Sequence, residues 1–322
     1  MEDIIKGRIF KIESKDYYLF DEYGNEIRCS LRGKFKKEFG FKADKLYRLD
    51  VAIIGDYVEY ELNKDGSGVI NKILPRKNHL SRKVPKLRGA GTRGERLEQI
   101  IAANIDNLVV VMSWHLPEFN NRLLDRILVT GESSHINLVV VINKSDLKTE
   151  SGEYDKWVKL YSKIGYQVYE ISVKNNQGIE DLINLLKGNT NLFWGQSGVG
   201  KSSLLNALYP ILNLKTGEIS TSTSKGKHTT VTSLMKKVDN ETYVIDTPGI
   251  REIDPYGIKK EDLGHFFIEF LPIINECKFN TCTHHHEPGC AIIKAVNDNI
   301  ISPDRYKSYL NILETVEDDM NF

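Results

Sequence analysis

Apolar and polar residues alternate in short segments over the first 75 residues, which predicts a series of β-strands. The predicted strands are residues 7–12, 17–20, 26–29, 56–62 and 69–74. Turn-forming sequences separate them, EYGN at 22–25 and NKDGSG at 63–68. Several short strands in about seventy residues are typical of a small barrel such as an OB-fold, and an SH3-like barrel is the alternative that periodicity does not distinguish.

From residue 106 onward the pattern changes to strands that alternate with amphipathic helices. The predicted strands are residues 106–114, 137–142, 166–171, 191–194 and 241–245, and the predicted helices are residues 121–130, 155–164, 178–186 and 203–208. This βαβ series predicts a parallel sheet covered by helices. Beyond residue 251 the pattern becomes helical and rich in loops, and it ends in a predicted helix at 304–316.

A phosphate-binding loop follows the predicted strand 191–194, because residues 195–202 (GQSGVGKS) match the pattern GxxxxGK[ST]. Its glycines let backbone N–H groups turn toward phosphate oxygens, and the following helix directs its N-terminus at the same anion. We expect Lys201 to reach the β- and γ-phosphates and the hydroxyl of Ser202 to bind Mg²⁺.

A guanine-binding motif, NKSD at 143–146, follows the continuous apolar run 137–142, as expected at the carboxyl end of a buried parallel strand. The carboxylate of Asp146 can accept hydrogen bonds from the ring N–H and the exocyclic amine of guanine, and adenine offers neither group at that edge. Ser172 and Lys174 end the next predicted strand and are expected to support the base. The residues expected to bind GTP are Asn143, Lys144, Ser145, Asp146, Ser172, Lys174, Gly195, Gln196, Ser197, Gly198, Val199, Gly200, Lys201, Ser202 and Ser203.

The third nucleotide motif is DTPG at 246–249, in which Asp246 is expected to hold Mg²⁺ and Gly249 to contact the γ-phosphate. A polar stretch that ends in GKHTT at 226–230 is the expected first switch segment, and Thr229 or Thr230 completes the Mg²⁺ shell. We favour Thr229. The residues expected to act in hydrolysis are Lys201, His228, Thr229 and Gly249.

The residue after Gly249 is Ile250, whose side chain cannot orient the attacking water as a glutamine does in Ras-type enzymes. Hydrolysis is therefore expected to be slow or assisted. Our hypothesis is that His228 positions the water once a bound partner aligns it.

The order of these motifs along the chain is inverted, because the guanine motif precedes the phosphate loop. A circularly permuted G domain keeps the same site and moves the chain termini. Here the DTPG motif runs directly into the C-terminal segment, so ordering by the γ-phosphate is expected to reposition that segment.

A metal centre is predicted near the C-terminus from three cysteines and a histidine, Cys277, Cys282, His284 and Cys290. This set completes a tetrahedral zinc site with no open position, which is typical of a structural ion. His285 and His286 are adjacent alternatives to His284. The remaining cysteine, Cys29, is expected to be a small buried apolar residue of the barrel.

Composition places the chain among cytosolic enzymes of two or three domains, with 322 residues, 40% hydrophobic residues and no net formal charge. No apolar run is long enough for a membrane span, and the acidic start of the chain lacks a signal core. We expect a cytoplasmic location and no membrane partner.

Basic residues are concentrated between residues 76 and 96, with eight lysines and arginines against one acidic residue, and again at 34–37. Such a stretch alone is often a solvated linker. Next to a barrel with exposed aromatic residues and lysines, contact with single-stranded RNA is the better interpretation. The eight residues are Arg76, Lys77, Arg82, Lys83, Lys86, Arg88, Arg93 and Arg96.

Together these patterns predict a multi-domain fold. We expect an N-terminal OB-fold β-barrel at residues 1–75, a central α/β circularly permuted P-loop G domain at 76–252, and a mostly α-helical zinc-binding domain at 253–322.

The chain resembles the circularly permuted GTPases of the small ribosomal subunit biogenesis family (RsgA type). The resemblance rests on AANID at 102–106, the NKSD, GQSGVGKSS, GKHTT and DTPG motifs, and the cysteine and histidine cluster. It implies GTP hydrolysis stimulated by the small (30S) subunit, a role in late maturation of that subunit, contact with 16S rRNA and a cytoplasmic monomer that binds no DNA. Val173 departs from the usual alanine of the second guanine motif.

We interpret the protein as an RNA clamp, in which the barrel and the zinc domain grip rRNA in the GTP state and release it after hydrolysis. Two alternatives stay open at this point. One is a permuted GTPase that acts on the large subunit or another ribonucleoprotein, and the other is an RNA-binding protein that senses GTP and GDP without useful turnover.

Overall fold

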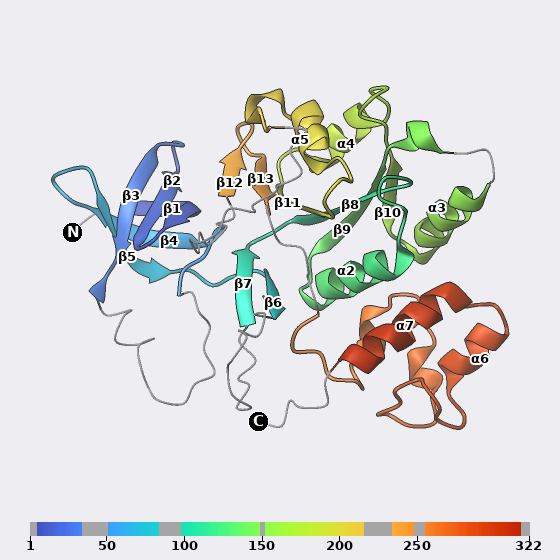
Figure 1. The fold of residues 1–322 in the computed structure, drawn as a ribbon. Helices are drawn as coiled ribbons and strands as arrows, with labels where there is room; N and C mark the ends of the chain where they lie inside the picture. Colours follow the sequence, from blue (N-terminus) through green and yellow to red (C-terminus); the bar gives the residue numbers. More distant parts are fainter. Residues whose placement is uncertain are drawn as a thin grey trace, which may run out of the picture.

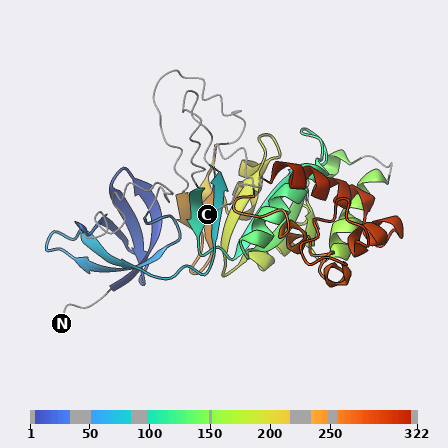
Figure 2. The same cartoon turned by 90° about the horizontal axis from the view of Figure 1, so that it is seen from below.

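The computed structural model describes residues 5–33, 51–83, 98–148, 152–215, 234–247 and 255–316. A β-barrel and a helical C-terminal part lie at opposite ends of the molecule, with a mixed α/β part between them (Figures 1 and 2). Within the described residues, no helix is both long and apolar enough to cross a membrane.

The N-terminal barrel is closed, with strand order β1-β2-β3-β5-β4 and β4 paired back to β1. Its strands are β1 (Ile5–Glu13), β2 (Asp16–Asp21), β3 (Glu26–Leu31), β4 (Tyr57–Leu62) and β5 (Gly68–Ile73). The β3–β5 pair is parallel and the other pairs are antiparallel. This arrangement is OB-like, so the OB prediction is confirmed. Ile9, Leu19 and Ile70 fill its interior, and Cys29 is buried among them as expected.

An antiparallel pair of strands lies between the barrel and the sheet, β6 (His79–Lys83) and β7 (Glu98–Ala103). Neither strand was predicted, because the basic residues at 76–96 indicated a linker or an RNA contact. The polar sequence HLSRK of β6 has only one fully buried apolar residue, Leu80, so the local pattern is too short to indicate a strand. Residues 84–97 lie outside the described part, so RNA contact by this segment stays a prediction.

The central sheet has the strand order β10-β9-β8-β11-β13-β12. Its strands are β8 (Asn107–Ser113), β9 (Asn137–Asn143), β10 (Gln167–Glu170), β11 (Thr190–Gly195), β12 (Leu234–Lys237) and β13 (Tyr243–Asp246). Neighbouring strands from β10 to β13 are parallel, as predicted, whereas β12 is an antiparallel edge strand that the sequence did not predict. The four residues of β12 include only one fully buried residue, Met235, and give no readable alternation.

Helices cover both faces of the sheet (Figure 1). They are α2 (Asn121–Ser133), α3 (Glu153–Ile164), α4 (Ile179–Leu186) and α5 (Lys201–Leu208). Alternate residues of β8 show the division, because Val110 belongs to the core with α2 and α3 and Val111 to the core with α4 and α5. The chain leaves β8 toward one edge of the sheet and β11 toward the other, so the neighbouring strands β8 and β11 mark the topological switch point, where open α/β sheets bind ligands.

The C-terminal part contains α6 (Ala291–Asn297), α7 (Pro303–Thr315) and 3₁₀ turns at Leu263–Phe266 and Ile274–Glu276. Phe267, Phe270 and Tyr309 form its aromatic core, with ring centroids 5.2 Å apart in each pair. Helix α7 packs along α2, so the C-terminal part rests on one flank of the sheet (Figure 1).

Candidate nucleotide site and metal centre

The residues predicted to bind GTP meet at the carboxyl edge of the sheet. The NKSD motif follows β9, the phosphate loop follows β11, and Asp246 ends β13. These strands are parallel, so their carboxyl ends share one edge. The inverted order of the motifs therefore does not separate them in space.

The phosphate loop joins β11 to α5 in a conformation that needs glycine. Gly198 and Gly200 have φ angles of +89° and +91°, which residues with a side chain rarely adopt. A Cβ on Gly200 would also overlap the amide nitrogen of Asn143. Val199 is buried between them, and Lys201 opens the helix with Gly200 as its N-cap, so the helix N-terminus faces the loop.

Two side chains of the NKSD motif hold the phosphate loop directly. The buried Asn143 donates from Nδ2 to the carbonyl oxygen of Val199 at 2.9 Å, and Lys144 donates from Nζ to the carbonyl oxygen of Gly198 at 2.7 Å. These bonds join segments 56 and 54 residues apart in sequence. The guanine motif and the phosphate loop therefore form one structural unit.

The side chain of Asp146 is held by the segment that follows β10. Ser172 donates from Oγ to Asp146 Oδ1 at 2.7 Å, and Nζ of Lys174 lies 3.8 Å from Asp146 Oδ2. The hydrogen bond from Ser172 lowers the pKa of Asp146, which keeps the carboxylate ionised and able to accept N–H donors. Ser145 supports the same segment, because its backbone N–H donates to the carbonyl oxygen of Ile171 at 3.0 Å.

Lys201, at the end of the phosphate loop, and Asp246, at the end of β13, form an ion pair. Both side chains are largely buried, with 14% and 26% of their surfaces exposed. The predicted phosphate-binding cation and the predicted Mg²⁺ carboxylate thus lie at the same point of the edge. Ser202 follows Lys201 at the start of α5, as expected for the hydroxyl that would bind Mg²⁺.

Several predicted residues lie outside the described part of the chain. They are His228, Thr229, Thr230, Gly249 and Ile250. The predictions for water positioning, for the threonine ligand of Mg²⁺ and for the γ-phosphate contact therefore stay predictions.

The loop after β8 is a part of the site that the sequence analysis did not single out. Lys144 donates from Nζ to the carbonyl oxygen of Leu116, whose φ is +54°, and Ser113 donates from Oγ to the carbonyl oxygen of Pro117 at 2.8 Å. Gly198 approaches the same loop, since a Cβ there would lie 3.5 Å from Pro117. The only sequence signal was a proline shortly after a predicted strand.

The predicted metal ligands come together in the C-terminal part. One ligand atom from each of Cys277, Cys282, His284 and Cys290 lies within 4.8 Å of the others. His284 Nδ1 lies 3.5 Å from Cys277 Sγ and 3.4 Å from Cys290 Sγ, and these two sulfurs are 3.9 Å apart. Ligand atoms around a tetrahedral ion with bonds of about 2.0–2.3 Å lie roughly 3.3–3.8 Å apart, so this cluster fits a metal.

The structure separates His284 from its two neighbours. His284 is 2% exposed, and Gly264 makes room for its ring, because a Cβ on Gly264 would lie 2.9 Å from ring atoms of His284. His285 and His286 are exposed, and their backbone N–H groups donate to Oε2 of Glu287 at 3.0 and 3.2 Å. Of the three histidines, His284 is the one that lies among the cysteines.

Burial sets the protonation of the cluster. Burial lowers the pKa of His284, which favours the neutral imidazole that binds a metal. Burial raises the pKa of Cys282 to about 12, so a thiolate at neutral pH requires a nearby cation. Both effects suit a site that is completed by a metal ion.

Comparisons with known proteins agree with this architecture. The family description "RsgA GTPase" matches residues 73–256, and "RsgA N-terminal domain" matches residues 6–70. The small ribosomal subunit biogenesis GTPase RsgA 2 of Bacteroides thetaiotaomicron is 37% identical over 316 residues, which covers 98% of both chains. The RsgA protein of Caldanaerobacter subterraneus is 37% identical over 314 residues, with 98% of this chain and 96% of the relative covered.

Solved structures show the same likeness. The crystal structure of YjeQ from Thermotoga maritima matches with a TM-score of 0.78 and 32% identity, over 98% of this chain and 99% of the other. YloQ, described as a circularly permuted GTPase, matches with a TM-score of 0.72 and 30% identity, over 98% and 96% of the two chains. This chain therefore belongs to the RsgA family and is a circularly permuted GTPase with an OB-like barrel and a C-terminal cluster of three cysteines and a histidine.

Proposed function

We propose that the protein binds GTP at the carboxyl edge of the sheet and hydrolyses it while it assists late maturation of the small (30S) ribosomal subunit. The observation that carries the proposal is the bonding of the NKSD motif to the phosphate loop, through Asn143 and Lys144, in spite of the inverted order along the chain. The small ribosomal subunit is proposed as the partner because the relatives are named small ribosomal subunit biogenesis GTPases.

The geometry suggests a role for each group. Asp146, supported by Ser172 and Lys174, receives the guanine edge. Backbone N–H groups of residues 196–203 surround the phosphates and Lys201 neutralises them. Ser202, Asp246 and Thr229 would hold Mg²⁺, which when bound neutralises the charge that develops on the phosphate oxygens. The water-positioning role of His228 and the contact of Gly249 belong to the same proposal.

The metal of the C-terminal cluster is proposed to be zinc. Three thiolates and one imidazole in a closed tetrahedral arrangement suit zinc and leave no position for a substrate. The ion would stabilise the helices that follow and take no part in the reaction.

We further propose three functional domains, at residues 1–75, 76–252 and 253–322, in a cytoplasmic monomer. The barrel and the zinc domain contact 16S rRNA, and GTP sets the strength of that grip. After hydrolysis the protein leaves the subunit.

The test is phosphate release from GTP by the purified protein, with and without purified small subunits. Large subunits and ATP serve as controls. We expect strong stimulation by small subunits alone and no release from ATP. Stimulation by large subunits instead would assign the protein to that particle. Absence of stimulation by either would favour a GTP and GDP sensor.

A further inference from the structure

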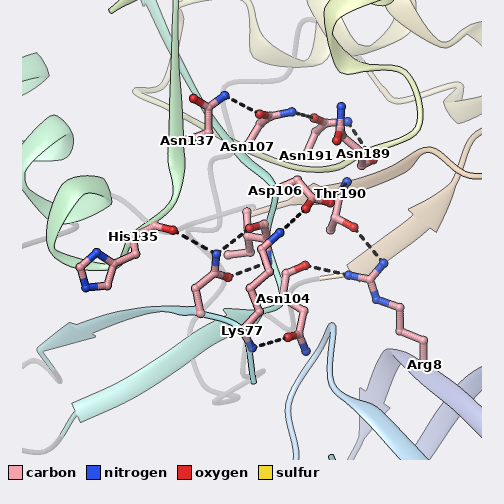
Figure 3. A network of polar contacts seen from close by, with 12 residues as sticks. Arg8, Lys77, Asn104, Asp106, Asn107, His135, Asn137, Asn189, Thr190 and Asn191 are labelled. Carbon is pink, nitrogen blue, oxygen red and sulfur yellow. Dashed lines mark hydrogen bonds and ion pairs between the residues drawn. The ribbon is translucent and has the colours of Figure 1, made fainter. Parts of the chain in front are cut away.

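The AANID sequence at 102–106 has no role in the nucleotide site, and the structure places it at the opposite, amino edge of the sheet. There it joins the end of β7 to the start of β8, and the barrel packs against it (Figure 3). Three parts of the chain therefore meet at this segment: the barrel, the β6–β7 pair and the sheet.

Arg8 of β1 reaches from the barrel into this meeting point. It is 6% exposed and donates to Thr190 Oγ1 at 2.8 Å, to the carbonyl oxygen of Asn104 at 2.9 Å and to that of Gly55 at 3.4 Å. Its guanidinium also lies 4.8 Å from the ring centre of Tyr57 in the barrel and 4.9 Å from that of Tyr243 in the sheet. A single side chain thus joins the barrel to the first residues of β11 and β13.

Thr190 is held through all of its polar groups. Besides the bond from Arg8, its N–H donates to Asp106 Oδ2 at 2.8 Å, and its carbonyl oxygen accepts the N–H of Asp106 at 2.9 Å. Asp106 is itself paired with Lys77. The strand that begins at Thr190 ends at Gly195 of the phosphate loop, so the bond from Arg8 attaches the barrel to the strand that carries the loop.

A row of asparagines extends the network to two more strands (Figure 3). Asn137 of β9 donates to Asn107 of β8 at 2.7 Å, and Asn107 donates to Asn191 of β11 at 2.8 Å. Asn107 and Asn191 are fully or nearly buried. Since β9 ends in the NKSD motif, the same edge also fixes the strand that carries the guanine site.

The barrel backbone lies directly against this edge. Ala103 donates from its N–H to the carbonyl oxygen of Ile54 at 2.9 Å, and Gly55 has a φ of +89°. A Cβ on Gly55 would overlap the carbonyl oxygen of Ala103. The contact leaves no space for a side chain and little freedom for movement between barrel and sheet.

We propose that Arg8 is a positioning residue and that Arg8, Gly55, Asn104, Asp106 and Thr190 form a rigid joint between barrel and sheet. RNA held by the barrel then places the nucleotide edge at a fixed position on the ribosomal subunit. This inference rests on the proposed function for its partner. A fixed orientation raises the rate of a reaction that needs a group from the partner, and it leaves the unassisted reaction unchanged.

The first test measures rigidity in the full-length protein without any partner. Spin labels at Leu62→Cys in the barrel and Ile211→Cys beyond α5 replace residues that are 50% and 75% exposed. Electron spin resonance should give one narrow distance distribution in this protein and a broader one after Arg8→Lys, because an ammonium cannot reach the three acceptors and two rings together. A broad distribution before the substitution would overturn the proposal.

The second test measures hydrolysis. With saturating small subunits, Arg8→Lys and Thr190→Val should each lower kcat about tenfold, while the rate without subunits and the affinity for GTP stay within about twofold. The matched control is Arg28→Lys, since Arg28 is a barrel arginine with 65% exposure that pairs with Asp16. Full stimulation of both variants, or an equal loss without subunits, would overturn the positioning role.

The two tests separate this inference from the proposed function. If the unsubstituted protein is not stimulated by small subunits, the proposed function fails. The distance distributions then still show whether the barrel is held rigidly against the sheet. If stimulation occurs and the distribution is broad, the proposed function stands and the joint is wrong.

Discussion

The barrel and the C-terminal part are each joined to the central sheet by a buried arginine, but the surroundings of the two arginines differ. Arg305 of α7 bonds carboxylates, at 2.5 Å to Asp125 of α2 and at 2.7 and 3.0 Å to Glu269. Arg8 bonds two carbonyl oxygens and a hydroxyl, and lies between two tyrosine rings. One joint depends on opposite charges and the other on shape and neutral acceptors.

The pKa values of Arg8 and Arg305 shift in opposite directions, which reflects this difference in surroundings. Burial lowers the pKa of Arg8, and nearby groups only partly oppose that effect. Burial acts on Arg305 in the same direction, but Asp125 and Glu269 outweigh it and raise its pKa well above the ordinary value. The contact of Arg305 with Asp125 and Glu269, the C-terminal joint, should therefore contribute mainly to the stability of the fold. The barrel joint should mainly set the orientation of the barrel relative to the sheet.

The joints also attach to different places. Arg305 binds the helix between β8 and β9 on the flank of the sheet, whereas Arg8 binds the amino ends of β11 and β13. The carboxyl ends of those two strands carry the phosphate loop and Asp246. Of the two joints, the barrel joint is therefore the one that contacts the strands carrying the phosphate loop and Asp246.

Metal removal should produce the largest difference in stability between the C-terminal part and the barrel. Structural zinc binding is worth on the order of 10 kcal/mol in small domains, so a chelator should unfold α6 and α7 and leave the barrel folded. Hydrogen exchange measures both regions in one sample. Unchanged exchange in the C-terminal part would show that its aromatic core is sufficient without a metal.

Arg305→Met should destabilise the protein by about 3–5 kcal/mol in denaturant unfolding, because Asp125 is fully buried and would keep an uncompensated charge. The double variant Arg305→Met and Asp125→Leu is the control, and it should recover most of the loss. A loss of less than about 1 kcal/mol in the single variant would show that the charged joint at Arg305 contributes little to stability.

Gly55→Ala should cost about 3 kcal/mol and widen the distance distribution between barrel and sheet, since its Cβ would overlap Ala103. Gly66→Ala is a matched control, with a φ of +82° and no atom within 4 Å of the added Cβ. It should cost only about 1 kcal/mol. Equal losses of stability in the two variants would mean that the barrel can shift to make room for a Cβ at Gly55.

Thr190→Val should lower stability by only about 1 kcal/mol, because it removes one hydrogen-bond acceptor and leaves the volume nearly unchanged. Thr315→Val removes a hydroxyl that accepts from Arg126 in an exposed contact and donates to the carbonyl oxygen of Ile312 within α7, and it should cost less than about 0.5 kcal/mol. Thermal unfolding compares the two. A loss at Thr190 no larger than at Thr315 would argue against a tight barrel joint.

The sequence was sufficient for the features that depend on local pattern. The alternation of the barrel strands, the apolar run before the NKSD motif and the spacing of the cysteines each reflect nearby residues. The structure groups His284 with the three cysteines, as the spacing predicts, and buries it beside Gly264, whereas its role as a metal ligand stays a prediction.

The features that were missed depend on contacts between distant segments. In β1, the residues from Gly7 to Phe10 are all buried, because one side of the strand faces the barrel interior and the other faces the sheet. Alternation alone cannot show that a charged residue such as Arg8 is buried by a segment 182 residues away. The pairing of β6 with β7 and the edge strand β12 are long-range contacts of the same kind.

We propose that the nucleotide at the carboxyl edge controls the grip on the small ribosomal subunit. The most direct measurement is the affinity of the full-length protein for purified small subunits, with a non-hydrolysable GTP analogue and with GDP. We expect tighter binding with the analogue, because a nucleotide can shift only an equilibrium between states that it binds differently. Equal affinities with the two nucleotides would show that the nucleotide does not control the grip on the subunit.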